Sequence, residues 1–534
     1  MSSVSLEEPV VTVSAPESTT EKHSYGEILR SSAWVGGSTV LNIGIGIVRT
    51  KILSILLGPA GFGLNGLYSS ITDVAQSIAG MGVNSSGVRQ IAESVGTGDQ
   101  IRIARTAAVL RRTSLLLGVF GALLVAVFAR QISQLTFGTT KHTAALGLLS
   151  IAVLFKLVAN GQTALIQGMR RISDLAKMNV LGAGLGLLLS IPLVYFFREE
   201  GIAPGLACVA AMTIAASWWY SRKIRVPAMR VTAADVKQEL SGLLKLGFAF
   251  MISGFLTMGA AYAVRILLLR RSGVAATGYY QAAWTLGGLY VGIILQAMGA
   301  DFYPRLTAQA NDNRAVNTIV NEQTKVGLLL AGPGVLATLV FAPVILLVFY
   351  SAKFHPALDL LRWLSLGTFL QVISWPMGFI VLAKGRQLIF LASDFAWAVV
   401  YLALAWALIG WIGTNGAGIA FCGSYAFHTL LNYVIARRLS TFRLARENGR
   451  LILSWSVLTA LLATASFTLS ARISLWLGIV GFLGGSYFSV SELLTAVPVE
   501  RLPRRLHAAL GALDRGSQRT ATIFRGMRGS VNRI

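Results

Sequence analysis

Long apolar runs separated by short polar segments make up most of this chain. A membrane-spanning helix needs about 20 mostly apolar residues, and by that criterion the pattern predicts fourteen spans. They are expected at residues 32–57, 64–84, 113–129, 143–165, 178–197, 202–220, 246–268, 276–300, 326–349, 363–383, 389–410, 415–436, 451–470 and 474–494. The predicted fold class is therefore an all-α polytopic membrane protein.

Positive residues between the spans indicate an orientation. Segments after even-numbered spans hold 24 Lys and Arg residues, whereas segments after odd-numbered spans hold 8. Because cytoplasmic loops carry the excess of Lys and Arg, both termini are expected in the cytoplasm. The first residues of the chain are rich in Ser, Thr and Glu and lack the basic start and apolar core of a signal peptide.

The chain also contains a repeat. The sequence VRTKILSILLGPAGFGL from Val48 resembles VRILLLRRSGVAATGYY from Val264. Matched positions at an offset of 216 are Arg49 with Arg265, Arg89 with Arg305, and Arg170 with Arg386. Each copy holds six predicted spans, so both have the same orientation, and the repeat axis is expected along the membrane normal. Two-lobed transporters built from repeats place their substrate between the halves.

These patterns predict a domain organisation. It comprises a disordered cytoplasmic tail (1–29), an N-terminal lobe of six helices (30–220), a basic cytoplasmic linker (221–245), a C-terminal lobe of six helices (246–437), two extra helices (451–494) and a basic cytoplasmic tail (495–534).

Composition narrows the class of function. The chain is 54% hydrophobic and 13% charged, with a formal net charge of +24. The basic residues fall in short clusters between apolar runs rather than on one face or arm, so nucleic-acid binding is not expected. Cys208 and Cys422 lie in apolar runs and form no metal-spaced pair. The segments between spans are short, so neither a catalytic residue nor a cofactor is predicted, and the protein is not expected to be an enzyme.

The stretch LLGPAGFGLNGLYSSITDVAQSIAGMGVNSSGVRQIAES, residues 56–94, resembles O-antigen and polysaccharide flippases. These belong to the multidrug/oligosaccharidyl-lipid/polysaccharide exporter superfamily. The resemblance implies a monomeric, multi-pass protein of the bacterial inner membrane with a cavity between two six-helix lobes. It implies that the protein moves an undecaprenyl-diphosphate-linked oligosaccharide from the cytoplasmic to the periplasmic leaflet by alternating access. Coupling to an H⁺ or Na⁺ gradient or to the membrane potential, and a place near the polysaccharide polymerase machinery, are further implications.

Charges inside the predicted spans indicate where such a substrate binds. A diphosphate carries negative charge, and the planar guanidinium of Arg donates paired hydrogen bonds to phosphate oxygens. Arg49 and Arg265, one in each lobe, are predicted to hold the diphosphate, although both lie near enough to a span end to snorkel. Lys156, near the middle of its span, is predicted to line the same cavity.

Three further residues complete the predicted binding set. Asp73, an acid near the middle of a span, is interpreted either as a partner of Arg49 or Lys156 or as a protonatable coupling site, and pairing is favoured. Arg89 and Arg305 lie at expected cytoplasmic span ends. They are interpreted either as headgroup-capturing residues or as ordinary positive-inside residues.

Three alternatives remain open. A lipid II flippase of the same superfamily would share the fourteen spans, but a double-arginine motif that we associate with that group in the second span is missing. A drug exporter of the superfamily would need intramembrane acids for its mostly cationic substrates. A membrane glycosyltransferase or polymerase would need acidic or His-containing catalytic loops, which the short outer segments lack.

Overall fold

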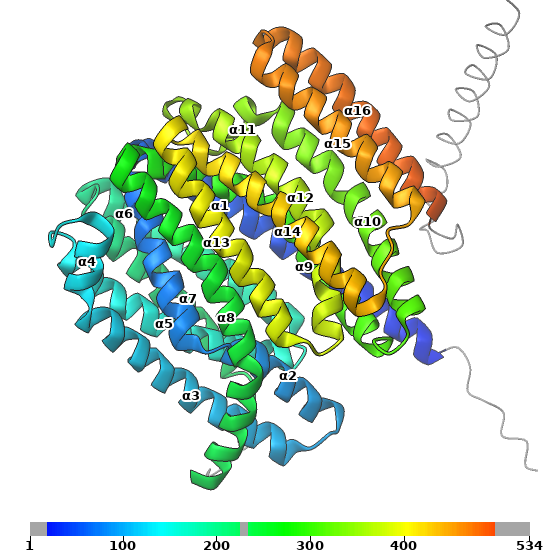
Figure 1. Ribbon diagram of the computed structural model, residues 1–534. Coiled ribbons are helices and arrows are strands. Elements are labelled where there is room, and N and C mark those ends of the chain that lie inside the picture. Colours follow the sequence, from blue (N-terminus) through cyan, green and yellow to red (C-terminus); the bar gives the residue numbers. More distant parts are fainter. Residues whose placement is uncertain (1–18, 225–232, 497–534) are drawn as a thin grey trace, which may run out of the picture. The chain divides into compact units, whose positions relative to one another are not determined.

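The computed structural model describes residues 19–224 and 233–496, and within these two ranges every regular element is a helix. The helices form two compact units, residues 1–262 and 263–534. Unit 1 contains α1 (Thr19–Gly80), α2 (Val83–Gly96), α3 (Gln100–Val127), α4 (Ala129–Phe137), α5 (Thr143–Gly168), α6 (Ile172–Phe197), α7 (Ile202–Ser221) and the first part of α8 (Ala233–Ser272) (Figure 1).

Unit 2 contains the end of α8 and all later elements. These are α9 (Val274–Ala308), α10 (Asn313–Val340), α11 (Ala342–Phe349), a 3₁₀ helix (Ala352–Ala357), α12 (Leu358–Ala383), α13 (Gln387–Ile412), α14 (Asn415–Ser440), α15 (Arg446–Thr468) and α16 (Ala471–Ala496). The all-α membrane fold expected from the apolar pattern is therefore confirmed.

Every predicted span overlaps a helix, although the number of spans stays a prediction. Twelve helices within the described residues are long and apolar enough to cross a membrane. One of them, Val40–Gly80, overlaps both of the first two predicted spans. Gly58 separates them with a backbone conformation (φ 63°, ψ −172°) that interrupts the helix.

The predicted boundary between lobes lies in the linker 221–245, of which residues 225–232 are outside the described residues. The units divide later, after Tyr262, within α8. The first part of α8 packs on unit 1: the Tyr262 hydroxyl is hydrogen-bonded to Thr136, and a Cβ at Gly254 would lie 3.2 Å from Ser77 Oγ. Of the expected tails, residues 1–18 and 497–534 lie outside the described residues, whereas residues 19–29 begin α1.

The internal repeat is visible in the backbone. Gly58, between the first two spans of unit 1, and Gly273 (φ 85°, ψ 174°), between α8 and α9, share a conformation that is essentially restricted to glycine. They lie 215 residues apart. Each glycine thus follows the first predicted span of its repeat and redirects the chain into the second.

Later junctions repeat in the same way. Arg198 (φ 51°, ψ −123°) and Gly413 (φ 68°, ψ −141°) both follow the fifth predicted span of their repeat, again 215 residues apart. Phe128 and Phe341 end α3 and α10 with nearly equal dihedral angles, and a short helix follows each. Helix pairs recur as well: α3 packs on α5, and α5 and α6 on α7, as α10 packs on α12, and α12 and α13 on α14.

The backbone changes the register of two matched positions. Measured from the shared glycine, Arg49 lies nine residues before Gly58 and Arg265 eight before Gly273. One residue turns a helix by about 100°, so the two arginines are not equivalent positions. Similarly, Arg386 and Arg171, rather than Arg170, occupy the same position, directly before α13 and α6.

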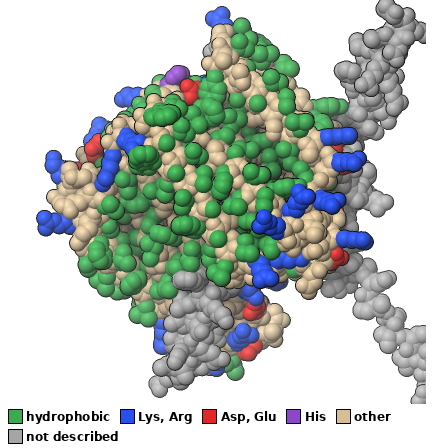
Figure 2. All heavy atoms as spheres, viewed as in Figure 1, with side chains coloured by type: hydrophobic (Ala, Val, Ile, Leu, Met, Phe, Trp, Pro, Cys, Tyr) green, Lys and Arg blue, Asp and Glu red, His purple; other side chains and the backbone are tan. Residues whose placement is uncertain are grey.

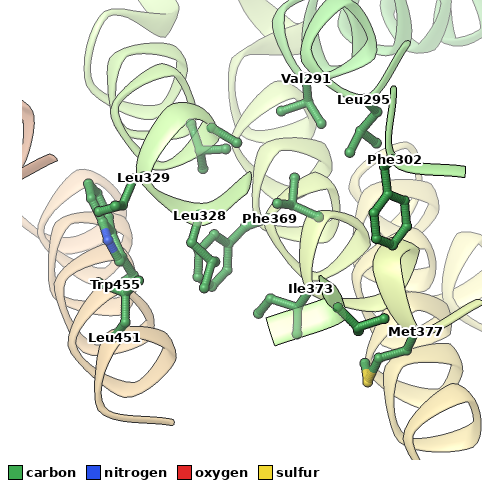
Figure 3. Packing of buried hydrophobic residues seen from close by; sticks show 14 of the residues in the cluster. Val291, Leu295, Phe302, Leu328, Leu329, Phe369, Ile373, Met377, Leu451 and Trp455 are labelled. Atoms are coloured by element: carbon green, nitrogen blue, oxygen red, sulfur yellow. The ribbon is translucent and has the colours of Figure 1, made fainter. Parts of the chain in front are cut away.

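The two helices that follow the second repeat are part of unit 2. Trp455 and Leu451 of α15 pack against Leu328 and Leu329 of α10, at the edge of a core that continues through α9 and α12 (Figure 3). Lys325 of α10 is ion-paired to Glu447 of α15 at 3.7 Å and to Glu492 of α16 at 3.4 Å. These contacts attach α15 and α16 to the repeat by both packing and charge.

The outer surface is apolar, as a lipid-facing surface requires. Hydrophobic side chains cover most of the visible face, and Lys and Arg side chains gather mainly toward its margins (Figure 2). Large side chains such as Trp406, Trp411, Trp476 and Phe196 are exposed. Because exposed apolar area of this extent does not suit water, the chain is a multi-pass membrane protein.

A histidine lies at the junction that precedes α5. His142 Nδ1 is 2.8 Å from the Tyr68 hydroxyl, and its ring stacks on Phe137 with centroids 4.0 Å apart. Burial lowers the pKa of His142, an effect that outweighs the opposing charge of Glu199. Protonation therefore opposes folding here, so the stability that neutral His142 contributes is present above about pH 6.5 and is lost as the pH falls through the lowered value.

We predict that His142→Gln makes thermal stability less dependent on pH. Gln keeps a hydrogen-bonding group near Tyr68 but does not titrate. The melting temperature of the purified protein, measured between pH 7.5 and pH 5, should fall less steeply for the variant than for the parent. Equal slopes would show that His142 does not carry this dependence.

Candidate functional site

The structure pairs two of the charged residues that the sequence singled out. Lys156 Nζ of α5 lies 3.0 Å from Asp73 Oδ1 and 3.3 Å from Thr72 Oγ1, both on α1. The lysine and aspartate side chains are 31% and 46% exposed. The expected pairing of Asp73 is thus present, with Lys156 as the partner. A lysine in the middle of an apolar helix needs such a partner because an uncompensated charge at bilayer depth costs several kcal/mol.

A polar cavity of about 170 Å³ begins one helical turn from this ion pair. Gln76 and Ser77 follow Asp73 by three and four residues on α1, and Asn160 follows Lys156 by four on α5. The remaining lining residues are Gly80, Gly82, Val83, Asn84, Ser85, Ser114, Leu117, Leu157, Gly161 and Met251. All of its polar side chains are amides or hydroxyls, so the cavity offers hydrogen bonds without charge.

Two residues of the lining, Asn84 and Gly161, explain features of this cavity. The Oδ1 atom of Asn84 is buried and has no hydrogen-bond partner within the described part of the chain. A buried polar atom without a partner is unfavourable by about 1–3 kcal/mol, so a ligand or water that donates a hydrogen bond to it is stabilised there. Gly161 allows α5 to approach α3, because a Cβ at this position would lie 2.6 Å from Ser114 Cβ.

Arg49 lies on α1, before the break at Gly58. Its Nε atom is buried and has no hydrogen-bond partner among the residues that the structure describes. A buried guanidinium nitrogen lacking an acceptor favours an anion that can supply one. Arg49 is therefore suited to an anionic ligand, and the structure does not place it in the Lys156–Asp73 pair.

Arg265, its sequence match in unit 2, has different surroundings. It is 5% exposed, and its Nε donates to Gln281 Oε1 at 2.9 Å. The guanidinium also lies over the rings of Tyr280 and Trp284, at 5.2 and 5.9 Å from their centroids. Stacking on aromatic rings and a hydrogen bond compensate this charge within unit 2.

The two remaining predicted residues are exposed. Arg89 of α2 forms an ion pair with Glu93 one turn later, with 2.8 Å between Nε and Oε1, and both side chains are exposed to solvent. Arg305 is exposed near the end of α9. Arg89 is not among the residues that line the cavity, and the role of Arg89 and Arg305 in capturing headgroups stays a prediction.

Sequence reasoning missed a buried polar cluster in unit 2. Asp394 Oδ1 of α13 lies 4.0 Å from His428 Nε2 of α14, and Ser374, Ser393 and Asn432 are hydrogen-bonded around them. Neither His428 nor Asp394, which lies near the start of its span, is among the site residues that the sequence predicts. Two signals were available: Ser393-Asp394 interrupts an apolar run, and His428 and Asn432 are four residues apart on one helix face.

Comparison with solved structures defines the fold. The chain resembles an inward-facing multidrug resistance MATE family transporter of the MOP superfamily, with a TM-score of 0.64 and 17% identity over 76% of this chain and 95% of that chain. It also resembles the lipid II flippase MurJ in an inward closed conformation, with a TM-score of 0.63 and 15% identity over 86% and 99% of the two chains. The fold is thus that of the multidrug/oligosaccharidyl-lipid/polysaccharide exporter superfamily, as the sequence resemblance implied.

Sequence comparison assigns the family. Residues 52–359, more than half of the chain, match the family described as "Polysaccharide biosynthesis protein", and the chain belongs to this family. A curated relative, the "Lipid III flippase" of Escherichia coli (strain K12), is 23% identical over 402 residues, which cover 74% of this chain and 95% of the relative. By the functions that their names state, these relatives are flippases and transporters rather than enzymes.

We predict that Lys156 and Asp73 are energetically coupled. Lys156→Met leaves the Asp73 carboxylate without its cation, whereas the double variant Lys156→Met/Asp73→Asn removes both charges. The coupling should be roughly 1 kcal/mol rather than the 3–5 kcal/mol of a fully buried pair, because both side chains are partly exposed. The melting temperature should therefore be lower for the single variant than for the double variant. A double variant as unstable as the sum of the two single variants would disprove the coupling.

Proposed function

We propose that this protein is a flippase that moves a lipid-linked oligosaccharide across the bacterial inner membrane, from the cytoplasmic to the periplasmic leaflet. Membership of a polysaccharide biosynthesis family and similarity to a lipid III flippase support this function. We further propose that the carrier is undecaprenyl diphosphate and that transport uses alternating access. The excess of Lys and Arg after even-numbered spans supports cytoplasmic termini.

The observation that carries the proposal is the buried Nε of Arg49, for which the described residues supply no acceptor. Phosphate oxygens are strong acceptors, and a diphosphate offers several of them with negative charge. Arg49 binds this group from α1 in the proposed complex. Lys156 contributes positive potential, and Asp73 restrains its position.

The neutral cavity is proposed to bind the sugar part of the substrate. Sugar hydroxyls both donate and accept hydrogen bonds, and the amides of Gln76, Asn84 and Asn160 can do the same. The cavity begins one turn from Lys156, which suits a ligand whose charged group is joined directly to a sugar. A cationic drug fits this arrangement poorly, because Asp73 is already paired with Lys156.

We predict that Arg49→Ala abolishes glycan export in the native host while protein level and membrane insertion stay unchanged. Arg49→Lys should restore export only in part, because an ammonium group is a point charge that cannot form the paired contacts of a guanidinium. The measurement is the amount of surface polysaccharide together with the amount of lipid-linked intermediate that accumulates in a strain lacking the chromosomal copy.

The matched control is Lys51→Ala. Lys51 is two residues from Arg49 and therefore about 200° around the same helix, so its loss tests for a general effect of removing charge from α1. Export should persist in this control. Export at the parental rate by Arg49→Ala would refute the proposed role of Arg49, and unchanged lipid-linked intermediates on deletion of the protein would refute the proposed function itself.

A further inference from the structure

The end of α7 combines aromatic and basic side chains. Three aromatic residues, Trp218, Trp219 and Tyr220, lie in the last turn of the helix, and two basic residues, Arg222 and Lys223, follow its end. The two tryptophan side chains are 53% and 49% exposed. Because tryptophan gathers where the hydrocarbon of a membrane meets the headgroups, this end of α7 is expected at headgroup level.

The aromatic rings restrain both cations. Arg222 Cζ lies 4.8 Å from the ring centroids of Trp218 and Trp219. Lys223 Nζ lies 4.3 Å from the ring centroid of Tyr220. Attraction between a cation and a ring is electrostatic and leaves the N–H donors unused. Neither basic side chain donates a hydrogen bond to any residue that the structure describes, so these donors can bind an anion.

The backbone that carries the two cations is fixed. Arg222 N donates to Trp218 O at 3.1 Å, and Lys223 N donates to Tyr220 O at 3.2 Å, which adds a turn beyond the helix. Ile224, the next residue, is 5% exposed and belongs to a core of unit 1 on which Tyr220 also packs. The cations therefore have defined positions rather than lying on a free segment.

The turn between α5 and α6 brings further positive charge to this place. Arg171 donates from Nη1 to Lys223 O at 3.5 Å and is ion-paired to Asp174 at 3.4 Å. Arg170 is exposed, and its side chain has no ion pair within the described part of the chain. Four cations and one carboxylate thus lie at two adjoining helix junctions. Basic pockets between helices at the membrane surface bind anionic lipid headgroups.

Unit 2 has basic residues at the matching place without the aromatic rings. Helix α14 corresponds to α7 in the repeat and has Arg437 and Arg438, both exposed, in its last turn. Among the described residues, no aromatic ring is stacked on either guanidinium. The excess of positive charge in cytoplasmic segments accounts for both basic pairs, whereas the restraint by aromatic rings is specific to α7.

We propose that the end of α7 and the α5–α6 turn form a binding site for the headgroup of an anionic phospholipid of the bilayer. Arg222 donates hydrogen bonds to the phosphate oxygens, and Lys223 and Arg170 add positive charge. The exposed indole rings pack against the start of the acyl chains. None of these residues lines the polar cavity of unit 1, so this lipid site is separate from the proposed substrate site and does not depend on the flippase function.

Native mass spectrometry of the full-length protein tests the lipid site without any transport substrate. The probes are phosphatidylglycerol and phosphatidylethanolamine with the same acyl chains, because both have one phosphate but only phosphatidylglycerol has a net negative charge. The parent should bind its first phosphatidylglycerol more tightly than its first phosphatidylethanolamine. Arg222→Gln/Lys223→Gln should reduce the affinity for phosphatidylglycerol roughly tenfold, since two cations at the membrane surface are lost.

Two further variants make the measurement specific. Arg437→Gln/Arg438→Gln is the matched control, because it removes the same charge from the matching helix end, and the first phosphatidylglycerol should still bind. Trp218→Leu/Trp219→Leu keeps every charge but should weaken binding, because Arg222 loses its restraint.

Four results would overturn the proposal. They are equal binding of the two phospholipids, equal losses in the two glutamine variants, unchanged binding in the tryptophan variant, and displacement of phosphatidylglycerol from this site by an equal concentration of undecaprenyl diphosphate. The last result would identify the anionic headgroup as that of the lipid carrier rather than of a bilayer phospholipid.

Discussion

A positive charge inside an apolar helix must be compensated, and this requirement organises both units of the protein. The chain meets it in three ways. Lys156 has a carboxylate partner in Asp73, and Arg265 has Gln281 and two aromatic rings. Arg49 has a buried Nε for which the described residues supply no acceptor. The first two solutions are complete within the protein, whereas the third favours an anion from outside it.

The two repeats share a backbone arrangement but differ in the polar interactions of their side chains. Gly58 and Gly273 have the same unusual backbone conformation, and the helix pairs that follow pack in the same order. Unit 1 uses this plan for an ion pair and a neutral polar cavity. Unit 2 uses it for aromatic rings around Arg265 and for the Asp394–His428 cluster. The two units share a backbone arrangement but carry different side chains on it, so each unit has polar groups of its own.

Much of the fold follows from the sequence because helix length and apolar composition are local properties. Each predicted span overlaps a helix, and the pairing of Asp73 was among the expected outcomes. Side-chain surroundings were harder to predict, since they depend on the rotation of each helix against its neighbours. Arg49 and Arg265 differ by one residue in their distance from the glycine that follows them, which turns the two side chains by about 100° relative to each other. For the same reason Asp394 and His428, which lie on different helices, gave no joint signal in the sequence.

The central claim is that Arg49 recognises the diphosphate of the lipid carrier. The most direct measurement is the shift in melting temperature of the purified protein with undecaprenyl diphosphate, compared with undecaprenol, which has the same hydrocarbon chain without the phosphates. A ligand that binds the folded state raises the melting temperature according to its affinity. The account predicts a larger shift with undecaprenyl diphosphate, reduced to that of undecaprenol in Arg49→Ala. Equal shifts with the two lipids, or an unchanged difference in Arg49→Ala, would contradict it.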